Sequence, residues 1–251
     1  MRNFAALSEC DISCQVEGGG PPLVCLHPAA GVRVTPAIEK LMQDFTVYLP
    51  SCPGFDETKE PDAPLSIPRI AAWMAEFIET IVAAPVELSG QSFGGWIACW
   101  VAVQRPDLVR SLVLQCPIGF GPLHPTPVDA GAAALLARTY AHPDRRRPEL
   151  KSEAVIARNR QLAARYSGGV VTDAELIERL HDLQARTLIL YGRKDGIVPI
   201  DGMLRLEKTI PGSRLVLVED AAHNIEVDQP DEYVRLVREF LAGESSTANG
   251  R

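Results

Sequence analysis

Short apolar runs alternate along the chain with longer segments in which apolar residues recur at helical spacing. Each run is closed by glycine, proline or polar residues, which is typical of buried strands. The segments between the runs place apolar side chains three and four positions apart, as one face of a helix does. This alternation predicts a mostly parallel sheet with helices on both faces. The expected strands are 4–8, 11–17, 23–26, 45–49, 86–89, 109–115, 187–191 and 215–218.

Local signals predict where two of the helices begin. Thr35 precedes Pro36, and Ser66 stands two residues before Pro68. A hydroxyl residue followed by proline in the first turn is a typical helix start. Apolar residues recur along the helix that Ser66 begins, and we expect all of them to pack in the core. They are Ile70, Trp73, Met74, Phe77, Ile78 and Ile81.

The alternation is lost between residues 118 and 183. Prolines break the beginning of this segment, and helical patterns follow near 130–140, 153–166 and 173–183. We interpret the segment as a helical cap or lid over the ligand-binding edge of the sheet, with residues 1–117 and 184–251 forming the core domain. The alternative is that its helices only complete the layer around the sheet.

Composition and charge narrow the class of protein. The chain has 251 residues, of which 46% are hydrophobic and 23% charged, so it can bury the core of one α/β domain. A net charge of −7 without a long basic run argues against nucleic acid or an anionic membrane as a partner. No apolar run reaches the roughly 18 residues that span a bilayer, and the N-terminus does not read as a signal peptide.

The cysteines and histidines carry no metal-ligand pattern. The six cysteines are scattered, without a Cys-x-x-Cys pair, and several stand in apolar runs as buried free thiols do. A reducing, cytoplasmic location is the simplest expectation. No zinc-ligand spacing links the cysteines with the histidines, so we expect no metal.

The stretch from Val86 to Trp96 carries the strongest chemical signal. An apolar run leads into Gly-Gln-Ser-Phe-Gly, and a helical segment follows at once. In this pattern Ser92 sits on a sharp turn with its hydroxyl exposed, and larger residues two positions away would collide. The helix start adds a positive dipole end and the free N–H of Phe93, which can face a developing oxyanion. The alternative is a turn that only lets the helix pack closely on the sheet.

Polar residues also follow other expected strands. Ligands of an open parallel sheet bind outside the carboxyl ends of its strands. Asp195 follows the seventh expected strand and His223 the eighth, whereas Cys116 follows the sixth and offers no carboxylate. The catalytic residues of an α/β-hydrolase triad follow one another in this chain order: Ser, then Asp, then His. Weaker candidates for the acid or the base are Glu219, Asp220, His27, His124, His142 and His181.

With these residues, the chain resembles the α/β-hydrolase superfamily over nearly its whole length. The resemblance is carried by Gly-Gln-Ser-Phe-Gly-Gly, by Pro-Gly-Phe after the fourth strand, by Tyr-Gly-Arg-Lys-Asp-Gly-Ile-Val-Pro and by Ala-Ala-His-Asn-Ile-Glu-Val-Asp-Gln-Pro. It implies the α/β-hydrolase fold, with a mostly parallel eight-stranded sheet, helices on both faces and a helical cap insertion. It also implies Ser92 as the nucleophile, His223 as its base and Asp195 as the residue that orients the histidine.

The same resemblance places the oxyanion hole. Its backbone N–H donors would be Phe93 and Ala29, two positions past His27. The chain departs from the usual His-Gly pair because residue 28 is proline, which lacks an N–H but is not the expected donor. We interpret His27 as a residue that positions this loop. Candidate pocket residues, for which core packing is the alternative, are Trp96, Phe120, Ile197 and Val198.

The leading functional hypothesis is a cofactor-independent serine hydrolase. It would cleave a carboxylic ester of a small or medium, partly apolar substrate through an acyl-enzyme on Ser92. The His-Pro-Ala-Ala-Gly loop and the Ser-Phe-Gly-Gly turn are similar to those of thioesterase domains of peptide and polyketide synthesis, which would imply a coenzyme A or carrier-protein thioester as substrate. The acid-to-histidine half is similar to esterases, lactonases and carbon–carbon bond hydrolases. Asn224 follows the histidine, where many carbon–carbon hydrolases carry tryptophan.

Two alternatives come from other functional classes. The same fold serves as a non-catalytic ligand-binding protein, for which a degraded triad would be the sign, and as a cofactor-free oxidative enzyme. A small-molecule substrate is the expected partner, and the sequence leaves open a monomer or a homodimer.

Overall fold

An eight-stranded sheet crosses the molecule in the order β1-β2-β4-β3-β5-β6-β7-β8. The computed structural model describes residues 2–125, 132–148 and 150–243. The pairings of β1 with β2 and of β2 with β4 are antiparallel, and all the other pairings are parallel. The predicted mostly parallel, eight-stranded sheet is therefore confirmed. The strands are β1 (Arg2–Ala6), β2 (Asp11–Gly18), β3 (Pro22–Leu26), β4 (Thr46–Ser51), β5 (Val86–Gln91), β6 (Val109–Gln115), β7 (Arg186–Gly192) and β8 (Arg214–Val218).

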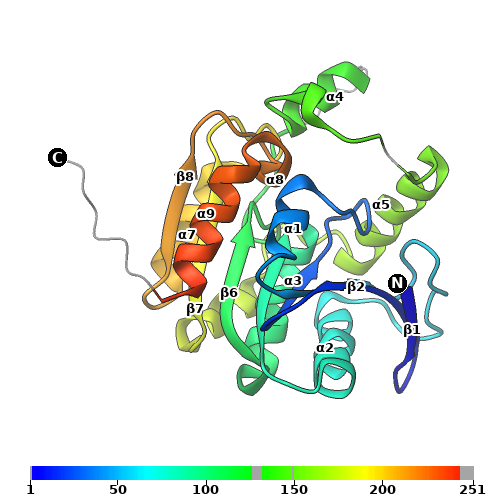
Figure 1. Cartoon of the computed structure of the whole chain (residues 1–251). Coiled ribbons are helices and arrows are strands. Elements are labelled where there is room, and N and C mark those ends of the chain that lie inside the picture. Colours follow the sequence, from blue (N-terminus) through cyan, green and yellow to red (C-terminus); the bar gives the residue numbers. More distant parts are fainter. Residues whose placement is uncertain (1, 126–131, 149, 244–251) are drawn as a thin grey trace.

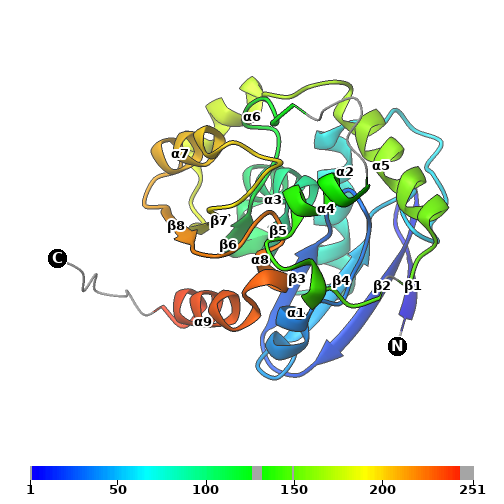
Figure 2. The same cartoon turned by 90° about the horizontal axis from the view of Figure 1, so that it is seen from above.

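Helices cover both faces of this sheet, as predicted (Figure 1). Figure 2 shows α1 and α9 on one face and α2, α3 and α7 on the other. Apolar side chains from the sheet and from both helical layers form one continuous core. The helices are α1 (Pro36–Leu41), α2 (Ile67–Phe77), α3 (Phe93–Gln104), α7 (Ile200–Thr209), α8 (Ile225–Asp228) and α9 (Pro230–Leu241).

The helix starts follow the capping signals, but one core prediction is wrong. Thr35 Oγ1 accepts the N–H of Ile38 at 3.2 Å, and Ser66 Oγ accepts that of Arg69 at 3.3 Å. Helix α2 continues into a π-helical turn over Ile78–Val82. This wider turn changes the helical phase, so Ile81 points outward and is 44% exposed. The other five apolar residues named for this helix are buried as expected.

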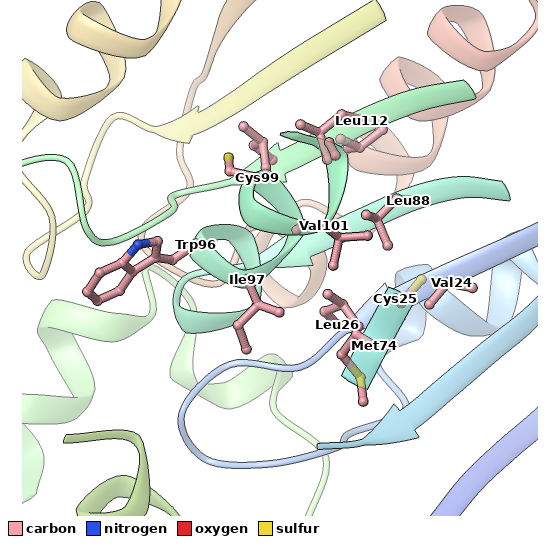
Figure 3. Close-up of a cluster of buried hydrophobic side chains, with 14 of the residues drawn as sticks. Val24, Cys25, Leu26, Met74, Leu88, Trp96, Ile97, Cys99, Val101 and Leu112 are labelled. Carbon is pink, nitrogen blue, oxygen red and sulfur yellow. The ribbon is translucent and has the colours of Figure 1, made fainter. Parts of the chain in front are cut away.

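Helix α3 is the central helix, and it packs on β3, β5, β6 and α2 (Figure 3). It is apolar on all sides and buried from Phe93 to Ala102, which is typical of a helix inside the core. In Figure 3 the indole of Trp96 points away from the other labelled side chains. The indole Nε1 atoms of Trp96 and Trp100 both donate to Asp173 Oδ2 at 2.8 Å. Asp173 is also the N-cap of α6 (Ala174–Arg179), so its carboxylate links α6 to α3 through hydrogen bonds.

The chain between β6 and β7 falls into two parts. Figures 1 and 2 show α4 and α5 above the carboxyl ends of the strands, whereas α6 packs beside α3. The first two residues of the helix predicted over 130–140 lie outside the described residues. The action of this segment as a cap stays a prediction. Its helices are α4 (Ala132–Thr139), α5 (Glu153–Ser167) and α6 (Ala174–Arg179).

Two further observations concern membrane-spanning helices and the state of the cysteines. Among the described residues, no helix has the length and apolar character needed to cross a membrane. All six cysteines are free thiols, and five of them are buried.

Candidate active site

Ser92 occupies a strained turn at the carboxyl end of β5. Its φ of 55° and ψ of −112° lie outside the regions that ordinary residues adopt, and such strain is concentrated at functional sites. Its N–H donates to the carbonyl of Gln115 at 2.9 Å, which ties the turn to the end of β6. A Cβ at Gly90 would lie 2.4 Å from a carbonyl of α3, and one at Gly94 would lie 2.2 Å from the last carbonyl of β3. Both glycines are therefore required for the turn.

Asp195 and His223 form a buried hydrogen-bonded pair beyond β7 and β8. His223 Nδ1 lies 2.8 Å from Asp195 Oδ2. Asp195 Oδ1 accepts the N–H of Ile197 at 2.7 Å and that of Val198 at 3.0 Å. Burial alone would raise the pKa of Asp195, but the neighbouring imidazole and these donors outweigh it and lower the pKa. The side chain is thus a carboxylate that can hold the imidazole with its proton on Nδ1.

A polar network joins the residues beside Ser92 and His223. Gln91 Nε2 donates to Asn224 Oδ1 at 2.7 Å and lies 3.3 Å from the carbonyl of His223. Arg33 donates to the same Asn224 oxygen at 2.7 Å and to the hydroxyl of Tyr140 at 2.7 Å. The neighbour of the candidate nucleophile is therefore bonded to the loop that carries the candidate base.

Asp228 binds the backbone of the loop that carries His223, and its role was not predicted from the sequence. Its fully buried carboxylate accepts three backbone N–H groups, from Ala222 at 2.8 Å, Ala141 at 3.0 Å and His142 at 2.9 Å. It thereby joins the residue before His223 to the chain after α4. The available signal was a carboxylate directly before the Gln-Pro at the start of α9.

The competing acids and bases lie elsewhere. Glu219 is exposed and pairs with Arg193. Asp220 pairs with Lys194 and lies 2.7 Å from His142 Nε2 near the surface. The structure therefore brings Asp195 against His223, rather than Glu219 or Asp220, which are closer to His223 in sequence. His124 and His181 are exposed.

Two residues with unpaired backbone N–H groups line one cavity beside the Ser92 turn. Ala29 and Phe93 both line a cavity of about 250 Å³. Neither N–H donates a hydrogen bond to any residue that the structure describes. The carbonyl of Pro28 is held at 2.9 Å by the N–H of Gly31. Because carbonyl and N–H point in opposite directions across a trans peptide, this bond constrains the Ala29 N–H from the Pro28 side.

His27 also holds the Pro28 carbonyl and is locked in one tautomer. Its Nε2 accepts the N–H of Cys52 at 3.0 Å, so we assign the proton to Nδ1, which lies 2.8 Å from the Pro28 oxygen. Burial lowers the pKa of His27 to about 4, although the charge of Asp56 opposes the shift. A neutral histidine with both nitrogens engaged positions the loop and has no free nitrogen to act as a base.

We expect the free energy of unfolding to fall by about 3 kcal/mol between pH 6.5 and pH 4 because of His27 alone. The unfolded chain binds a proton near pH 6.5, whereas folded His27 does so only near pH 4. The unfolded state is thus favoured as the pH falls through this window. Urea unfolding of the wild type and of His27→Gln across that range measures the difference. The variant should show the shallower pH dependence, and equal slopes would contradict a buried neutral histidine.

Cys116, Asp195 and His223 are the one group, within the described ranges, whose ligand atoms could surround a metal ion. These atoms lie within 4.8 Å of one another. Burial raises the pKa of the Cys116 thiol far above its usual range, and thiols bind metals as thiolates. The Asp195 and His223 atoms are already bonded to each other. The cluster therefore fits an acid–base pair better than a metal centre.

The predicted pocket residues do not line one cavity. Trp96 lines the 250 Å³ cavity together with Ala29 and Phe93. Phe120 and Val198 line a separate cavity of about 80 Å³ beside α7, and Ile197 is half-buried against the core. Sequence reasoning missed the wall that α5 gives to the larger cavity, because the path of residues 118–183 could not be derived. That wall consists of Arg160, Ala163, Ala164 and Ser167.

Comparisons with known proteins agree with this geometry. A model of the "Alpha/beta hydrolase family" matches residues 23–236. A 2-hydroxy-6-oxo-2,4-heptadienoate hydrolase of Pseudomonas putida is 27% identical over 90% of this chain and 91% of its own length. A pimeloyl-[acyl-carrier protein] methyl ester esterase of Aeromonas hydrophila is 27% identical over 92% of this chain and 99% of its own. The crystal structure of naproxen esterase from Bacillus subtilis superposes with a TM-score of 0.76 at 17% identity, covering 96% of this chain and 91% of that one.

Proposed function

Because the chain belongs to the alpha/beta hydrolase family, we propose that it is a cofactor-independent serine hydrolase that cleaves a carboxylic ester of a small or medium, partly apolar substrate. The observation that carries this proposal is the buried Asp195–His223 hydrogen bond beside the strained turn of Ser92. A turn that served packing alone would need neither a strained serine nor a buried carboxylate–imidazole pair.

The proposed reaction follows from the position of each group. His223 takes the Ser92 proton on Nε2 as Ser92 Oγ attacks the ester carbonyl, and Asp195 stabilises the imidazolium that forms. The N–H groups of Ala29 and Phe93 bind the oxyanion. The alcohol leaves with the proton from His223. Water activated by the same imidazole then attacks the acyl-enzyme, which releases the acid and restores Ser92.

The cavity beside Ala29 and Phe93 supports an apolar substrate group. Its walls include Trp96, Ile118 and Leu123, and Leu123 is partly exposed at the surface. An apolar acyl or alcohol group bound there would remove the exposed part of this wall, such as Leu123, from water. This favours an ester of modest size over a strongly polar substrate.

Hydrolysis of a carbon–carbon bond is the second candidate, and Arg160 is the observation that favours it. Arg160 lines the same cavity, and no described residue forms a hydrogen bond or an ion pair with its guanidinium. A dienoate, the substrate class in the name of the Pseudomonas relative, carries a carboxylate that such a cation could bind. Asn224 after the histidine counts mildly against this candidate.

One experiment compares the candidates directly. Turnover of p-nitrophenyl butyrate, butyryl-coenzyme A and 2-hydroxy-6-oxo-2,4-heptadienoate is measured side by side with the wild type and Arg160→Gln. We expect the ester to be preferred. A thioester preference would assign the protein to the thioesterases. A dienoate preference, with KM raised by Arg160→Gln for the dienoate more than for the ester, would favour the second candidate. No turnover by a folded protein would overturn acyl transfer and favour a binding or oxidative role.

The proposal also covers the cellular compartment of the protein and its binding partner. The free, mostly buried thiols support a reducing compartment such as the cytoplasm. We propose a small molecule as the partner of the site, in a monomer or a homodimer.

A further inference from the structure

Three polar side chains meet outside the loop of residues 28–32, the oxyanion loop, which carries Ala29. Asp56 comes from the turn after β4, Lys151 from the chain before α5, and Asn159 from α5. Asp56 Oδ1 accepts Lys151 Nζ at 3.0 Å and Asn159 Nδ2 at 2.8 Å. The backbone N–H of Asp56 donates to Asn159 Oδ1 at 3.1 Å. These three residues, the loop clamp, link the core to the segment between β6 and β7.

The loop clamp binds the polar backbone groups of the oxyanion loop. The Ala30 carbonyl accepts Asn159 Nδ2 at 3.1 Å and Lys151 Nζ at 3.2 Å. The N–H of Val32 donates to Asp56 Oδ2 at 2.9 Å. The Val32 carbonyl accepts Lys151 Nζ at 2.6 Å. The half of the loop that follows Ala29 is therefore held by side chains from two distant parts of the chain.

The clamp lies so close to the loop that only glycine can occupy position 31. Gly31 has a φ of +92°, and a Cβ on it would lie 2.3 Å from Asp56 Oδ1 and 2.5 Å from Asn159 Nδ2. Asn159 is fully buried, and the side chains of Lys151 and Asp56 are only 16% and 11% exposed. Burying such groups costs free energy unless they are bonded, and here each makes at least three bonds.

The charge of Asp56 is maintained despite its burial. Burial alone would raise the pKa of this carboxyl, but His27, Lys151 and the N–H of Val32 outweigh it and lower the pKa. Asp56 can therefore accept several donors at once at neutral pH. A neutral carboxylic acid would lose one acceptor and its attraction to Lys151.

We propose that the loop clamp is a positioning site that sets the direction of the Ala29 N–H, so that stabilisation of the oxyanion depends on the bonds that Asn159 of α5 and Lys151 make with the loop. This inference rests on the proposed function. The loop is held at Pro28 by His27 and Gly31, and from Ala30 onward by the clamp. With both sides of Ala29 fixed, its N–H needs no reorganisation as charge develops on the substrate oxygen.

The chain offers a matched control for the docking of α5 itself. Arg165 of the same helix pairs with Glu60 at 2.6 Å, beyond the same turn after β4. The side chains of this pair are 58% and 43% exposed, and neither forms a hydrogen bond with the oxyanion loop, whose residues the structure describes throughout. Arg165→Gln therefore removes a link between α5 and the core without touching the loop.

The test compares Asn159→Ala and Asp56→Asn with Arg165→Gln. Loss of a whole oxyanion donor lowers kcat by about 10²- to 10³-fold, so a misdirected donor should lower it by about 10- to 100-fold. We expect that loss for p-nitrophenyl butyrate in the two clamp variants, with KM changed by less than about 3-fold. Affinity for butylboronic acid, whose adduct with serine places an oxygen in the oxyanion hole, should fall by the same factor. Arg165→Gln should keep kcat and boronate affinity.

Hydrogen exchange of the peptide that spans residues 28–32 separates failure of this inference from failure of the proposed function. We expect this peptide to exchange at least about 10-fold faster in Asn159→Ala than in the wild type or Arg165→Gln. If the wild type hydrolyses no ester, the proposed function fails, and the exchange result alone then decides whether the clamp holds the loop. Unchanged exchange overturns the inference. In an active enzyme, unchanged kcat and boronate affinity in both clamp variants also overturn it, as would an equal loss in Arg165→Gln.

Discussion

Replacing Ser92 with alanine should lower kcat/KM for p-nitrophenyl butyrate by about 10⁴-fold or more. The variant has no nucleophile to form the acyl-enzyme, so only the oxyanion hole and substrate binding could still assist water. The free energy of unfolding should change little, because alanine meets the same backbone strain at φ 55° as serine does. Steady-state kinetics and urea unfolding measure the two effects.

Ser89→Ala is the matched control for this prediction. Ser89 is a buried serine of β5, just before the turn that carries Ser92, and its hydroxyl lies 3.4 Å from that of Tyr233 of α9. Its replacement should leave kcat/KM within about 3-fold of the wild type. If Ser92→Ala kept more than a tenth of the activity, or if both variants lost it alike, Ser92 would not be the nucleophile.

Replacing Asp195 with asparagine should lower kcat by about 10³- to 10⁴-fold. The amide keeps the volume of the carboxylate but has no charge to stabilise the imidazolium of His223. Its NH₂ group can also turn toward Nδ1 and favour the tautomer with the proton on Nε2, which cannot accept the Ser92 proton. The Asp195 side chain is buried, so water cannot replace the lost acceptor.

Glu219→Gln is the control for the Asp195 prediction. Glu219 is an acid beside the last strand, but its side chain is 72% exposed and pairs with Arg193. Its kcat should stay within about 2-fold of the wild type. Comparable losses in the two variants would point to a general effect of charge and would contradict the role of Asp195.

The local signals of the sequence were sufficient to predict the sheet, the sharp turn at Ser92 and the positions of Asp195 and His223 just beyond two strands. The Gly-x-Ser-x-Gly turn could be predicted because its steric requirement acts between near neighbours, as the carbonyl contacts at Gly90 and Gly94 illustrate. Asp195 and His223 could be predicted because parallel strands end at one edge of the sheet, and both residues directly follow a strand. No knowledge of the distant chain was needed.

Contacts that depend on the path of residues 118–183 could not be predicted from the sequence. Asp228 and Asn159 bond to backbone groups far from them in sequence, which no local pattern reveals. Phe120 forms a β-bridge with Thr172, and its side chain lines the cavity beside α7 rather than the one beside Phe93. Ile81 fails for a local reason, since the π-helical turn that rotates it outward has no clear sequence signature.

If hydrolysis proceeds through an acyl group on Ser92, mass spectrometry of an acid-quenched reaction should detect that group. The protein is mixed with p-nitrophenyl butyrate, quenched during turnover, and analysed intact and as peptides. We predict a mass increase of one butyryl group, located on Ser92 and absent from Ser92→Ala. Turnover of the ester with no adduct, or with the butyryl group on another residue, would contradict the account.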